Sequence, residues 1–437
     1  MNILVRYRPS GGNAKEISAS VEAAIRAGDL APGDHLPSVR SLAAELGVSP
    51  TTVAAAYGAL RRRGIVTGAG RGGTRIRPAP PVSTRGYMRA PEGTRDLISG
   101  GPDPGLLPAI PSRPSARAAR LYAETPVAPR LRDLAAAQLT ADGVDASSLA
   151  VTGGALDAIE RVLATWLTSG DRVVVEDPGH AVTFDLIAAM GLAPVPVPVD
   201  EFGMRPDGLA LALSRGAGAV ILTPRAQAAT GAAWDAARAA DLRATLRDYP
   251  SAGLIEDDHA GPVAGTPGFT ASPELARWAT VRSVSKSLGP DFRLAVLAGD
   301  ETTIARVTGR QALGTGWVSY LLQETVADLW SEPANAAISH AASVYTRRRI
   351  ALRSALAAHG IAASGRSGFT CWVPVADEDR VASALASAGW AVAPGRRFRI
   401  AAPPGVRICF ATLGEEDAEP FAAAFARALH DRAGRVD

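Results

Sequence analysis

From Leu97 onward, short apolar runs alternate with segments of helical periodicity, and this alternation limits the fold more than any other feature of the chain. The predicted strands are 172–176, 219–222, 253–256, 281–284 and 294–298, and the predicted helices are 155–167, 181–190, 232–246 and 338–359. Strand–helix alternation over this length predicts an α/β domain with a mostly parallel sheet. Such sheets bind ligands at the carboxyl ends of their strands, so residues that directly follow the strands are candidates for a site.

The composition is that of an ordinary globular protein with enough apolar residues for a large core. The chain has 437 residues, of which 47% are hydrophobic, and this length suggests roughly two to three domains. It has no uncharged apolar run long enough to span a membrane. The first ten residues lack the apolar core of a signal peptide. Cys371 and Cys409 are too few for a disulfide framework and have no metal-ligand spacing. We therefore expect a cytoplasmic protein with no metal and no membrane partner.

The first 78 residues are basic, with 11 Arg and Lys against 5 Asp and Glu, whereas the remainder is mildly acidic. A helical rhythm runs from 14 to 27, and Ser38 is placed to cap a short helix that ends before Gly47. Ser49 is placed to cap a second helix. Two short helices joined by a three-residue turn with glycine predict a helix-turn-helix. Residues 65–76, rich in glycine around Arg71, predict a β-wing.

Several polar residues of this module are candidates for DNA contacts. The second helix of such a motif enters the major groove with its N-terminal end first, and here that end carries Thr51 and Thr52. Arg40, one turn into the preceding helix, could reach phosphate or guanine, and Arg71 could reach the minor groove. For each of these residues the alternative is a solvated helix face or loop, and for Arg61 to Arg63 that alternative is preferred.

The string LPSVRSLAAELGVSPTTVAAAYGALRRRGIV, followed by GGT, resembles the winged helix of the GntR family along nearly its whole length. The resemblance implies a dimer that binds operator DNA through Arg40, Ser49, Thr51, Thr52 and the wing. The stretch 79–96 after this module lacks periodicity and begins with prolines, so it predicts an extended linker between domains 1–78 and 97–437.

Lys286 stands out because the chain has 46 basic residues and only two of them are lysines. A desolvated lysine can lose its proton and attack a carbonyl, which arginine cannot do. Ser283 and Ser285 precede it and Arg293 follows, and this set suits a phosphate attached to the carbonyl compound. The pattern therefore suggests a lysine that forms a Schiff base with pyridoxal 5'-phosphate (PLP). An ordinary surface lysine is the alternative.

Two further motifs follow predicted strands. Gly154 and Ala155 stand where a strand meets a helix, and backbone N–H groups at a helix N-terminus can hold phosphate. Such a glycine pair can equally be a simple turn. Asp257 follows a buried strand and could pair with a protonated pyridine nitrogen, which makes the ring an electron sink. A solvated loop acid is the alternative for Asp257, and more so for Asp258.

Taken in order, T-x-G, E-D-P, P-x-x-Q-x-x-T-G, E-D-D and S-x-S-K-x-L-x-P-x-x-R resemble the motifs of fold-type I aminotransferases over about residues 97–430. The resemblance implies that Lys286 forms the Schiff base and Asp257 pairs with the pyridine nitrogen. It implies a phosphate site made by Gly154, Ala155, Ser283, Ser285 and Arg293. It also implies that Arg407 grips the α-carboxylate of an amino acid, as a bidentate guanidinium can, although a structural surface arginine is the alternative there.

The chain departs from a competent aminotransferase at several positions. His180 and His259 stand where the family has an aromatic residue and a tyrosine, and Ala228-Ala229 replaces Asn-Pro. His259 or Gln227 could supply the lost hydrogen bond to the cofactor, and His180 could still stack on its ring. Fewer groups then tune the ring. Catalysis needs interactions that strengthen in the transition state, whereas sensing needs only differential binding, so these losses favour a receptor over an enzyme.

A GntR head on an aminotransferase-like body is similar to the MocR (GabR-like) regulators. The strings GALDAIERVL, VEDPGH and VRSVSKSLGPDFRLA resemble a subgroup linked to vitamin B6. This resemblance implies a homodimeric transcription regulator that senses PLP and controls B6 salvage, such as a pyridoxal kinase gene. Three alternatives stay open: a working PLP-dependent aminotransferase with a tethering head, a regulator that senses an amino acid or amine through an external Schiff base, and a body that has lost PLP and only dimerises.

Overall fold

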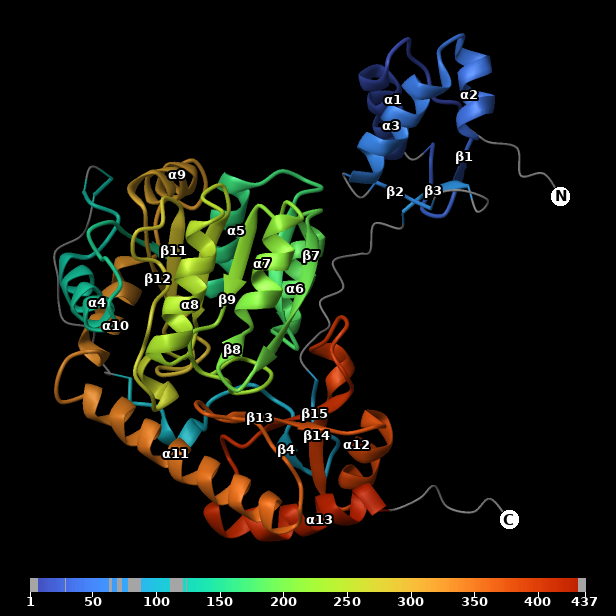
Figure 1. Ribbon diagram of the computed structural model, residues 1–437. Helices are drawn as coiled ribbons and strands as arrows, with labels where there is room; N and C mark the ends of the chain where they lie inside the picture. The colour runs from blue at the N-terminus through green and yellow to red at the C-terminus, as the bar shows by residue number, and fades with distance from the viewer. Residues whose placement is uncertain are drawn as a thin grey trace, which may run out of the picture. The chain divides into compact units, whose positions relative to one another are not determined.

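The structure is a computed structural model that describes residues 7–27, 29–62, 65–68, 73–77, 88–110, 121–122 and 124–430. The chain divides into two compact units, one with the N-terminal residues and one with most of the remainder (Figure 1). Each unit has its own hydrophobic core.

The N-terminal unit is a three-helix domain with a small sheet. Its helices are α1 (Ala14–Ala27), α2 (Val39–Leu46) and α3 (Pro50–Arg62), and its strands are β1 (His35–Leu36), β2 (Val66–Thr67) and β3 (Thr74–Ile76). The strands pair antiparallel in the order β1-β3-β2. Ile17, Val53 and Leu60 are fully buried between the helices. The predicted winged helix-turn-helix is therefore confirmed.

The turn between α2 and α3 forms as the sequence predicts. The Ser38 side chain accepts a hydrogen bond from the backbone N–H of Ser41 (3.1 Å) and caps α2. Gly47 ends this helix with a φ of +66°, in the left-handed region that favours glycine. Ser49 Oγ accepts from the backbone N–H of Thr52 (3.1 Å) at the start of α3. The caps at Ser38, Gly47 and Ser49 therefore set where helix α2 begins and ends and where α3 begins.

The larger unit is built on an eight-stranded sheet with the order β5-β12-β11-β10-β9-β6-β7-β8. The strands are β5 (Leu149–Thr152), β6 (Arg172–Asp177), β7 (Ala193–Asp200), β8 (Gly203–Met204), β9 (Ala219–Leu222), β10 (Gly253–Asp258), β11 (Trp278–Ser283) and β12 (Ala295–Gly299). Strands β6, β9, β10 and β11 run parallel, and β12 is antiparallel to both β11 and β5. The predicted α/β class with a mostly parallel sheet is confirmed.

Helices cover both faces of this sheet (Figure 1). The helices of this part are α4 (Pro129–Ala141), α5 (Ala155–Trp166), α6 (Ala181–Ala189), α7 (Pro206–Ser214), α8 (Ala236–Arg247), α9 (Glu301–Ala312) and α10 (Tyr320–Leu329). Of these, α4 and α10 pack against each other. Helix α8 begins four residues later than predicted, because Trp234 is hydrogen-bonded to Pro224 O (2.9 Å) and Asp235 caps the helix by accepting from Arg238 N (2.8 Å).

A second, four-stranded sheet has the order β13-β15-β14-β4. Its strands are β4 (Arg95–Leu97), β13 (Thr370–Pro374), β14 (Trp390–Pro394) and β15 (Gly405–Cys409), and helices α11 (Asn335–Ala358), α12 (Glu378–Ser387) and α13 (Ala418–His430) pack with it (Figure 1). Short 3-10 turns occur at η2 (Pro104–Leu106), η3 (Gly261–Ala264), η4 (Gly395–Arg397) and η5 (Glu415–Asp417).

The predicted linker ends earlier than the sequence suggests, because strand β4 begins at Arg95. The sequence assigns Arg95 and Asp96 to the linker 79–96, but both lie in β4, which pairs parallel with β14 through Trp390↔Arg95 and Ala391↔Asp96. The pairing partner is distant in sequence, so local periodicity gives no sign of this strand. Within the described part of the chain, no helix is both long enough and apolar enough to cross a membrane. The same residues contain no cluster of side chains suited to a metal ion.

Candidate functional site

The register of three neighbouring strands gathers the candidate residues at one edge of the large sheet. In this register Ala295 at the start of β12 pairs with Thr152 at the end of β5 and with Ser283 at the end of β11. The residues that follow Thr152 and Ser283, and those that precede Ala295, therefore leave the sheet at the same place. This register brings Gly154, Ala155, Ser285, Lys286 and Arg293 together, although they span 140 residues of sequence.

The residues around Gly154 and Arg293 form a cradle of hydrogen-bond donors suited to a phosphate. Gly154 is buried with a φ of +113°, and a Cβ added there would lie 2.9 Å from Nη2 of Arg293. Ala155 begins α5, so the N-terminal backbone N–H groups of that helix face the same space. Ser283 Oγ lies 3.0 Å from Ser285 Oγ, and the Ser285 N–H donates to Ser283 Oγ (3.2 Å). Hydroxyls, helix N–H groups and a guanidinium are the donors that a phosphate needs.

Lys286 has the electrostatic setting of a nucleophilic amine. Its Nζ donates a hydrogen bond to the carbonyl oxygen of Gly100 (2.5 Å). Burial lowers the pKa of Lys286 to about 8. The nearby charges of Arg407 and Arg293 lower it too, while Cys409 and Asp257 act in the opposite direction. A lysine with this pKa is partly neutral near pH 7 to 8, which a lysine attack on an aldehyde requires.

Asp257 is a buried carboxylate that still has an unused oxygen. Its exposed fraction is 6%, and within the described residues its Oδ1 atom has no hydrogen-bond partner. Burial, followed by the charge of Asp258, raises the pKa of Asp257 to about 7, and the charge of Lys286 acts to lower it. Buried polar atoms are seldom left unpaired. An aromatic N–H⁺ next to Asp257 would supply the missing donor, so the residues present fit the pyridine ring of PLP.

The two histidines of the site are neutral at physiological pH. Burial lowers the pKa of His180 to about 3, and the charges of His259, Lys286 and Arg407 lower it further. Burial also lowers the pKa of His259 to about 4, with the charge of Lys286 acting in the same direction. His180 Nδ1 is 2.9 Å from Thr183 Oγ1, which holds its ring in place. Neutral imidazoles can stack on a ring or exchange a hydrogen bond, so both roles suggested by the sequence remain predictions.

Gln227, a candidate for a hydrogen bond to the cofactor, has protein partners at both ends of its side-chain amide. This residue is fully buried, and its Nε2 donates to the carbonyl oxygen of Pro178 (2.7 Å). Its Oε1 accepts from the backbone N–H groups of Ala229 (3.0 Å) and Thr230 (2.8 Å) and from the Thr230 hydroxyl (2.9 Å). These bonds hold the loop 226–231 against the end of β6. Gln227 therefore supports the loop of the site, and its predicted contact to a cofactor stays a prediction.

Arg407 is buried, so the alternative of a surface arginine is wrong. Its exposed fraction is 6%, and its Nε and Nη1 donate to the carbonyl oxygens of Ala228 and Ile98 (both 2.9 Å). The guanidinium lies over the ring of Phe398, 4.8 Å from its centre. A Cβ at Gly100 would be 2.7 Å from Nη2 of Arg407. Arg407 and Lys286 therefore approach the same glycine, which the sequence reasoning overlooked although Gly100-Gly101-Pro102 marks a tight backbone approach.

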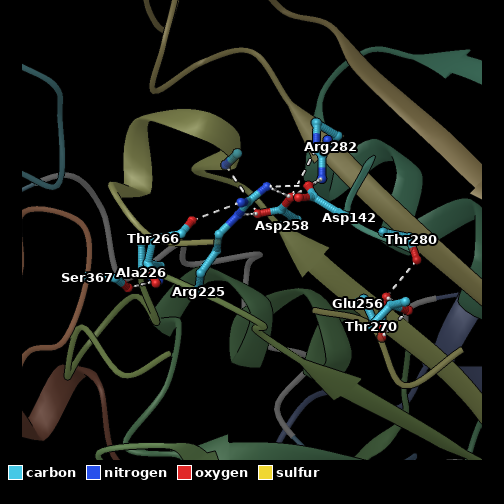
Figure 2. Close-up of polar contacts among 11 residues, drawn as sticks. Asp142, Arg225, Ala226, Glu256, Asp258, Thr266, Thr270, Thr280, Arg282 and Ser367 are labelled. Atoms are coloured by element: carbon cyan, nitrogen blue, oxygen red, sulfur yellow. Dashed lines mark hydrogen bonds and ion pairs between the residues drawn. The ribbon is translucent and has the colours of Figure 1, made fainter. Parts of the chain in front are cut away.

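A buried charge network lies behind Asp257, and the sequence reasoning overlooked it. Asp258 accepts from Arg225 Nε and Nη2 (both 2.9 Å) and from Arg282 Nε (2.9 Å) and Nη2 (2.6 Å). Both arginines also contact Asp142, as Figure 2 shows. The interpretation of Asp258 as a solvated loop acid is therefore wrong. The network fixes the end of β10 from which Asp257 projects.

Glu256, the third acid of this strand, is fully buried and bonded to hydroxyls. It accepts from the Thr270 and Thr280 hydroxyls (both 2.8 Å to Oε2) and from the Ala271 N–H (2.7 Å to Oε1), and Figure 2 shows the two hydroxyl groups beside it. Burial raises its pKa to about 7. Successive acids of β10 thus have different surroundings, and of these three it is Asp257 that has a buried carboxylate oxygen without a hydrogen-bond partner among the described residues.

In the N-terminal unit the predicted DNA-contact residues lie at the surface. Arg40 on α2 and Thr51 on α3 are exposed. Ser49 Oγ is 2.6 Å from Thr51 Oγ1 and 2.8 Å from Thr52 Oγ1, so these three hydroxyls form one polar patch at the start of α3. Arg61 donates to the carbonyl oxygen of Gly68 (3.0 Å) and braces the wing. Arg71 lies outside the described residues.

The larger unit has the fold of a fold-type I, PLP-dependent aminotransferase, and its candidate site is centred on Lys286. In the comparisons, the family "Aminotransferase class I and II" matches residues 99–425, and "Bacterial regulatory proteins, gntR family" matches residues 13–76. The chain belongs to the MocR-like regulators of the GntR family, which join these two parts. The resemblance found in the sequence is confirmed.

Several named relatives match over much of the chain. The "Vitamin B6 salvage pathway transcriptional repressor PtsJ" of Salmonella typhimurium is 40% identical over 96% of this chain and 99% of its own. The "HTH-type pyridoxine biosynthesis transcriptional regulator PdxR" of Corynebacterium glutamicum is 29% identical over 56% of this chain and 55% of its own. The "Probable rhizopine catabolism regulatory protein MocR" of Rhizobium meliloti is 27% identical over 73% of this chain and 71% of its own.

Among solved structures, the α-aminoadipate aminotransferase LysN of Thermus thermophilus, complexed with N-(5'-phosphopyridoxyl)-L-leucine, matches with a TM-score of 0.68 and 21% identity. The match covers 77% of this chain and 92% of LysN. It shows a shared fold. PLP, the cofactor expected from the sequence, agrees with this family and with the residues that form the site.

Proposed function

We propose that the protein is a transcription regulator that binds operator DNA and senses PLP, and through it the vitamin B6 status of the cell. The observation that carries the proposal is the complete lysine, aspartate and phosphate-cradle set of Lys286, Asp257, Gly154 and Arg293 in a chain with a GntR-type head. The relative PtsJ, a vitamin B6 salvage pathway repressor, supports the same choice of effector. We propose a B6-salvage gene, such as one for a pyridoxal kinase, as the target.

The residues of the site have separate roles toward this ligand. When bound, PLP supplies an aldehyde and a protonated pyridine ring that can act as an electron sink. Lys286, held by Gly100, provides the amine for the aldehyde, and the free Oδ1 of Asp257 accepts the pyridine N–H. The cradle at Gly154 and Arg293 holds the phosphate, with Ala155, Ser283 and Ser285. His180 stacks on the ring, and His259 is the side chain left to bond the phenolic oxygen.

A sensing role is favoured over an enzymatic one by what has replaced the family's tuning groups. Ala228 and Ala229 have no side-chain donor, and the Gln227 amide is bonded to Pro178 and to its own loop. His259 replaces a tyrosine and is neutral. Ligand binding without a finely tuned ring is sufficient for a sensor, because an effector shifts an equilibrium through differential affinity alone.

We propose that the regulator acts as a homodimer with head 1–78 and a linker from 79 to a body that begins with β4 at Arg95. The body exposes apolar side chains near α10: Tyr122 and Leu313 are each 92% exposed and Leu321 is 68% exposed. The Tyr122 ring contacts the Trp317 ring edge-on at 5.6 Å, so Tyr122 lies beside the loop that carries Leu313. Exposed apolar groups gathered in this way mark a protein interaction surface. Because the partner is operator DNA, the site of action is the cytoplasm.

The test combines spectroscopy with DNA binding. Holo-protein should show an absorbance band of a lysine-bound PLP, and PLP should change operator affinity or footprint. Borohydride treatment should leave a pyridoxyl group on Lys286, detected by mass spectrometry. Lys286→Ala should lose the band and the PLP response but keep operator binding without PLP. If PLP leaves the DNA footprint unchanged, the proposal that the protein senses PLP is contradicted.

A second candidate function is a working aminotransferase with a DNA-binding head. Arg407 favours it, because a buried guanidinium next to Gly100 and Lys286 is suitably placed for the carboxylate of an amino acid. The same placement suits a regulator that captures an amino acid or amine as an additional effector. Steady turnover of an amino acid with a keto acid, abolished by Lys286→Ala, would establish the enzyme. Capture without turnover would establish the effector.

A further inference from the structure

Arg349 on α11 is a buried cation that forms no ion pair with any residue the structure describes. Its exposed fraction is 8%, and its Nη1 donates to the carbonyl oxygen of Gly368 (3.2 Å). Its Nη2 lies 3.5 Å from Thr346 Oγ1. Among the described residues no carboxylate forms an ion pair with it. Burial and the charge of Arg353 lower its pKa. Buried charges are normally paired, so the position calls for an anion.

A cavity opens beside this arginine. It has a volume of about 520 Å³, within the range of small-molecule sites. Helix α11 lines it with both arginines and with Ile350, Ser354 and Ala357, and the segment after the helix adds Ile361, Ala362 and Ala363. Glu201 at the rim takes one Nη2 bond of Arg353 (3.1 Å), and both of these side chains are partly exposed. Glu201 is the one acid among the residues that line the cavity, so the two arginines together carry one more positive charge than this lining balances.

We infer that this cavity binds a small organic anion, a carboxylate or phosphate monoester with a short apolar body, whose charged end pairs with Arg349 and Arg353. A guanidinium pair suits the oxygens of either head group. The alanine and isoleucine side chains suit a short aliphatic body. The site is distinct from the cofactor site at Lys286, and the inference stands whether or not the proposed function holds.

The cavity is connected to the cofactor site by one layer of hydrogen bonds. Arg353 Nε and Nη1 donate to the carbonyl oxygens of Ala363 (3.2 Å) and Gly365 (3.1 Å). The adjoining Arg366 N–H donates to Gly231 O (2.8 Å), and the Ser367 hydroxyl accepts from Ala226 N (2.6 Å; Figure 2). These bonds reach both ends of the loop 226–231.

That loop forms one side of the cofactor site. Its Ala228 carbonyl oxygen accepts from Arg407, and its Gln227 amide donates to Pro178, two residues before His180. An anion that draws the two arginines of α11 together acts on the segment 363–368, and through it on this loop. The cavity is therefore placed to act as a second effector site.

The test uses full-length protein and calorimetric titration with three probes: isovalerate, its neutral analogue isovaleramide, and inorganic phosphate. Isovalerate or phosphate should bind, and isovaleramide should bind at least about tenfold more weakly, since a charge-assisted contact is lost. Ala362→Phe fills the cavity while leaving both arginines in place, and it should weaken the anion by about tenfold or more. Arg349→Met should do the same. Arg347→Gln, on the exposed side of the same helix, is the matched control and should change nothing.

Three outcomes would overturn the inference. The first is that neither anion binds. The second is that Ala362→Phe binds isovalerate as tightly as the wild type. The third is that Arg407→Lys abolishes anion binding while Ala362→Phe does not, which would place the anion at the cofactor site. The PLP absorbance band of Ala362→Phe reports the cofactor site separately, so a failure here is distinguishable from a failure of the proposed function.

Discussion

The Nζ atom of Lys286 donates a hydrogen bond to the carbonyl oxygen of Gly100, which lies 186 residues earlier in the chain. The bond brings the loop after β11 to the segment that follows β4, so the reactive amine is held between the large sheet and the smaller one. A neutral carbonyl does not raise the pKa of the amine as a carboxylate would. Lys286 is therefore positioned without being locked in its charged form.

The rate at which Lys286 captures PLP should rise with pH and level off above about pH 8. Only the neutral amine attacks, and the pKa of Lys286 is lowered to about 8 from the ordinary 10.5. Stopped-flow absorbance between pH 6.5 and 10 measures this rate. Free Nα-acetyl-lysine, the control, should keep accelerating beyond pH 9. A protein rate that also keeps rising to pH 10 would show that the site does not depress this pKa.

Asp257→Asn should weaken PLP binding by about tenfold or more, because it removes the acceptor of the pyridine N–H. The same change should stabilise the apo-protein at pH 8, by about 1–3 kcal/mol, because a buried unpaired charge is removed. The folded pKa, raised to about 7, exceeds the ordinary 3.8. The stability linked to Asp257 is therefore present below about pH 4 and lost as pH rises through 7.

Urea unfolding of apo wild type and apo Asp257→Asn at pH 5 and pH 8 measures this effect. The advantage of the variant should be larger at pH 8. Equal stability differences at the two pH values would mean that Asp257 is not a strained carboxylate in the apo-protein.

Asp258→Asn should destabilise the larger unit by about 3–5 kcal/mol, because it leaves Arg225 and Arg282 with only Asp142 to balance two buried charges. Thermal and urea unfolding measure the loss. Asp207→Asn, which breaks an exposed ion pair with Arg205, is the control and should leave the melting temperature unchanged within error. Similar melting temperatures for the two variants would show that this charge network does not stabilise the larger unit.

Arg40→Ala should weaken operator binding by about tenfold, the usual cost of losing one arginine contact to DNA. The PLP absorbance band should be unaffected, because Arg40 lies in the N-terminal unit. Fluorescence anisotropy with labelled operator measures the affinity. Arg247→Ala, an exposed arginine on α8, is the matched control. If both variants bind operator as tightly as wild type, Arg40 is not in the DNA interface.

Leu313→Glu should shift the protein from dimer to monomer, because a charge placed in an apolar contact is costly to bury. Sedimentation velocity measures the change. Leu211→Glu alters another exposed leucine, on α7, and should leave the dimer intact. A dimer that persists in Leu313→Glu would move the interface elsewhere on the body.

Much of the fold follows from local pattern. Buried strands such as Ala219–Leu222 are apolar along their length, and Ser38 and Gly47 supply caps that work in isolation. Lys286 could be singled out because the chain otherwise uses arginine almost throughout. These features depend on residues a few positions apart, so the sequence is sufficient to predict them.

The sequence predictions fail where residues distant in sequence determine the structure or the surroundings of a residue. Arg95 is in a strand only because Trp390 pairs with it. Asp258 is buried because Asp142 and Arg225 bring compensating groups from other elements. Gln227 has the polarity of a ligand contact, but its direction is fixed by the loop and by Pro178. A polar side chain in sequence does not show which partner it will face.

Among the described residues, the two cations beside Gly100 are held by backbone carbonyl oxygens and not by ion pairs: Arg407 by those of Ile98 and Ala228, and Lys286 by that of Gly100. In the proposed role, the phosphate of the ligand adds negative charge to a site that holds Lys286, Arg293 and Arg407 against one acid, Asp257. Unphosphorylated vitamers such as pyridoxal would leave the excess positive charge of the site unbalanced. Selectivity among the B6 vitamers would then depend on charge balance as much as on shape. The phosphate ester would be the group by which the regulator distinguishes PLP from the other forms.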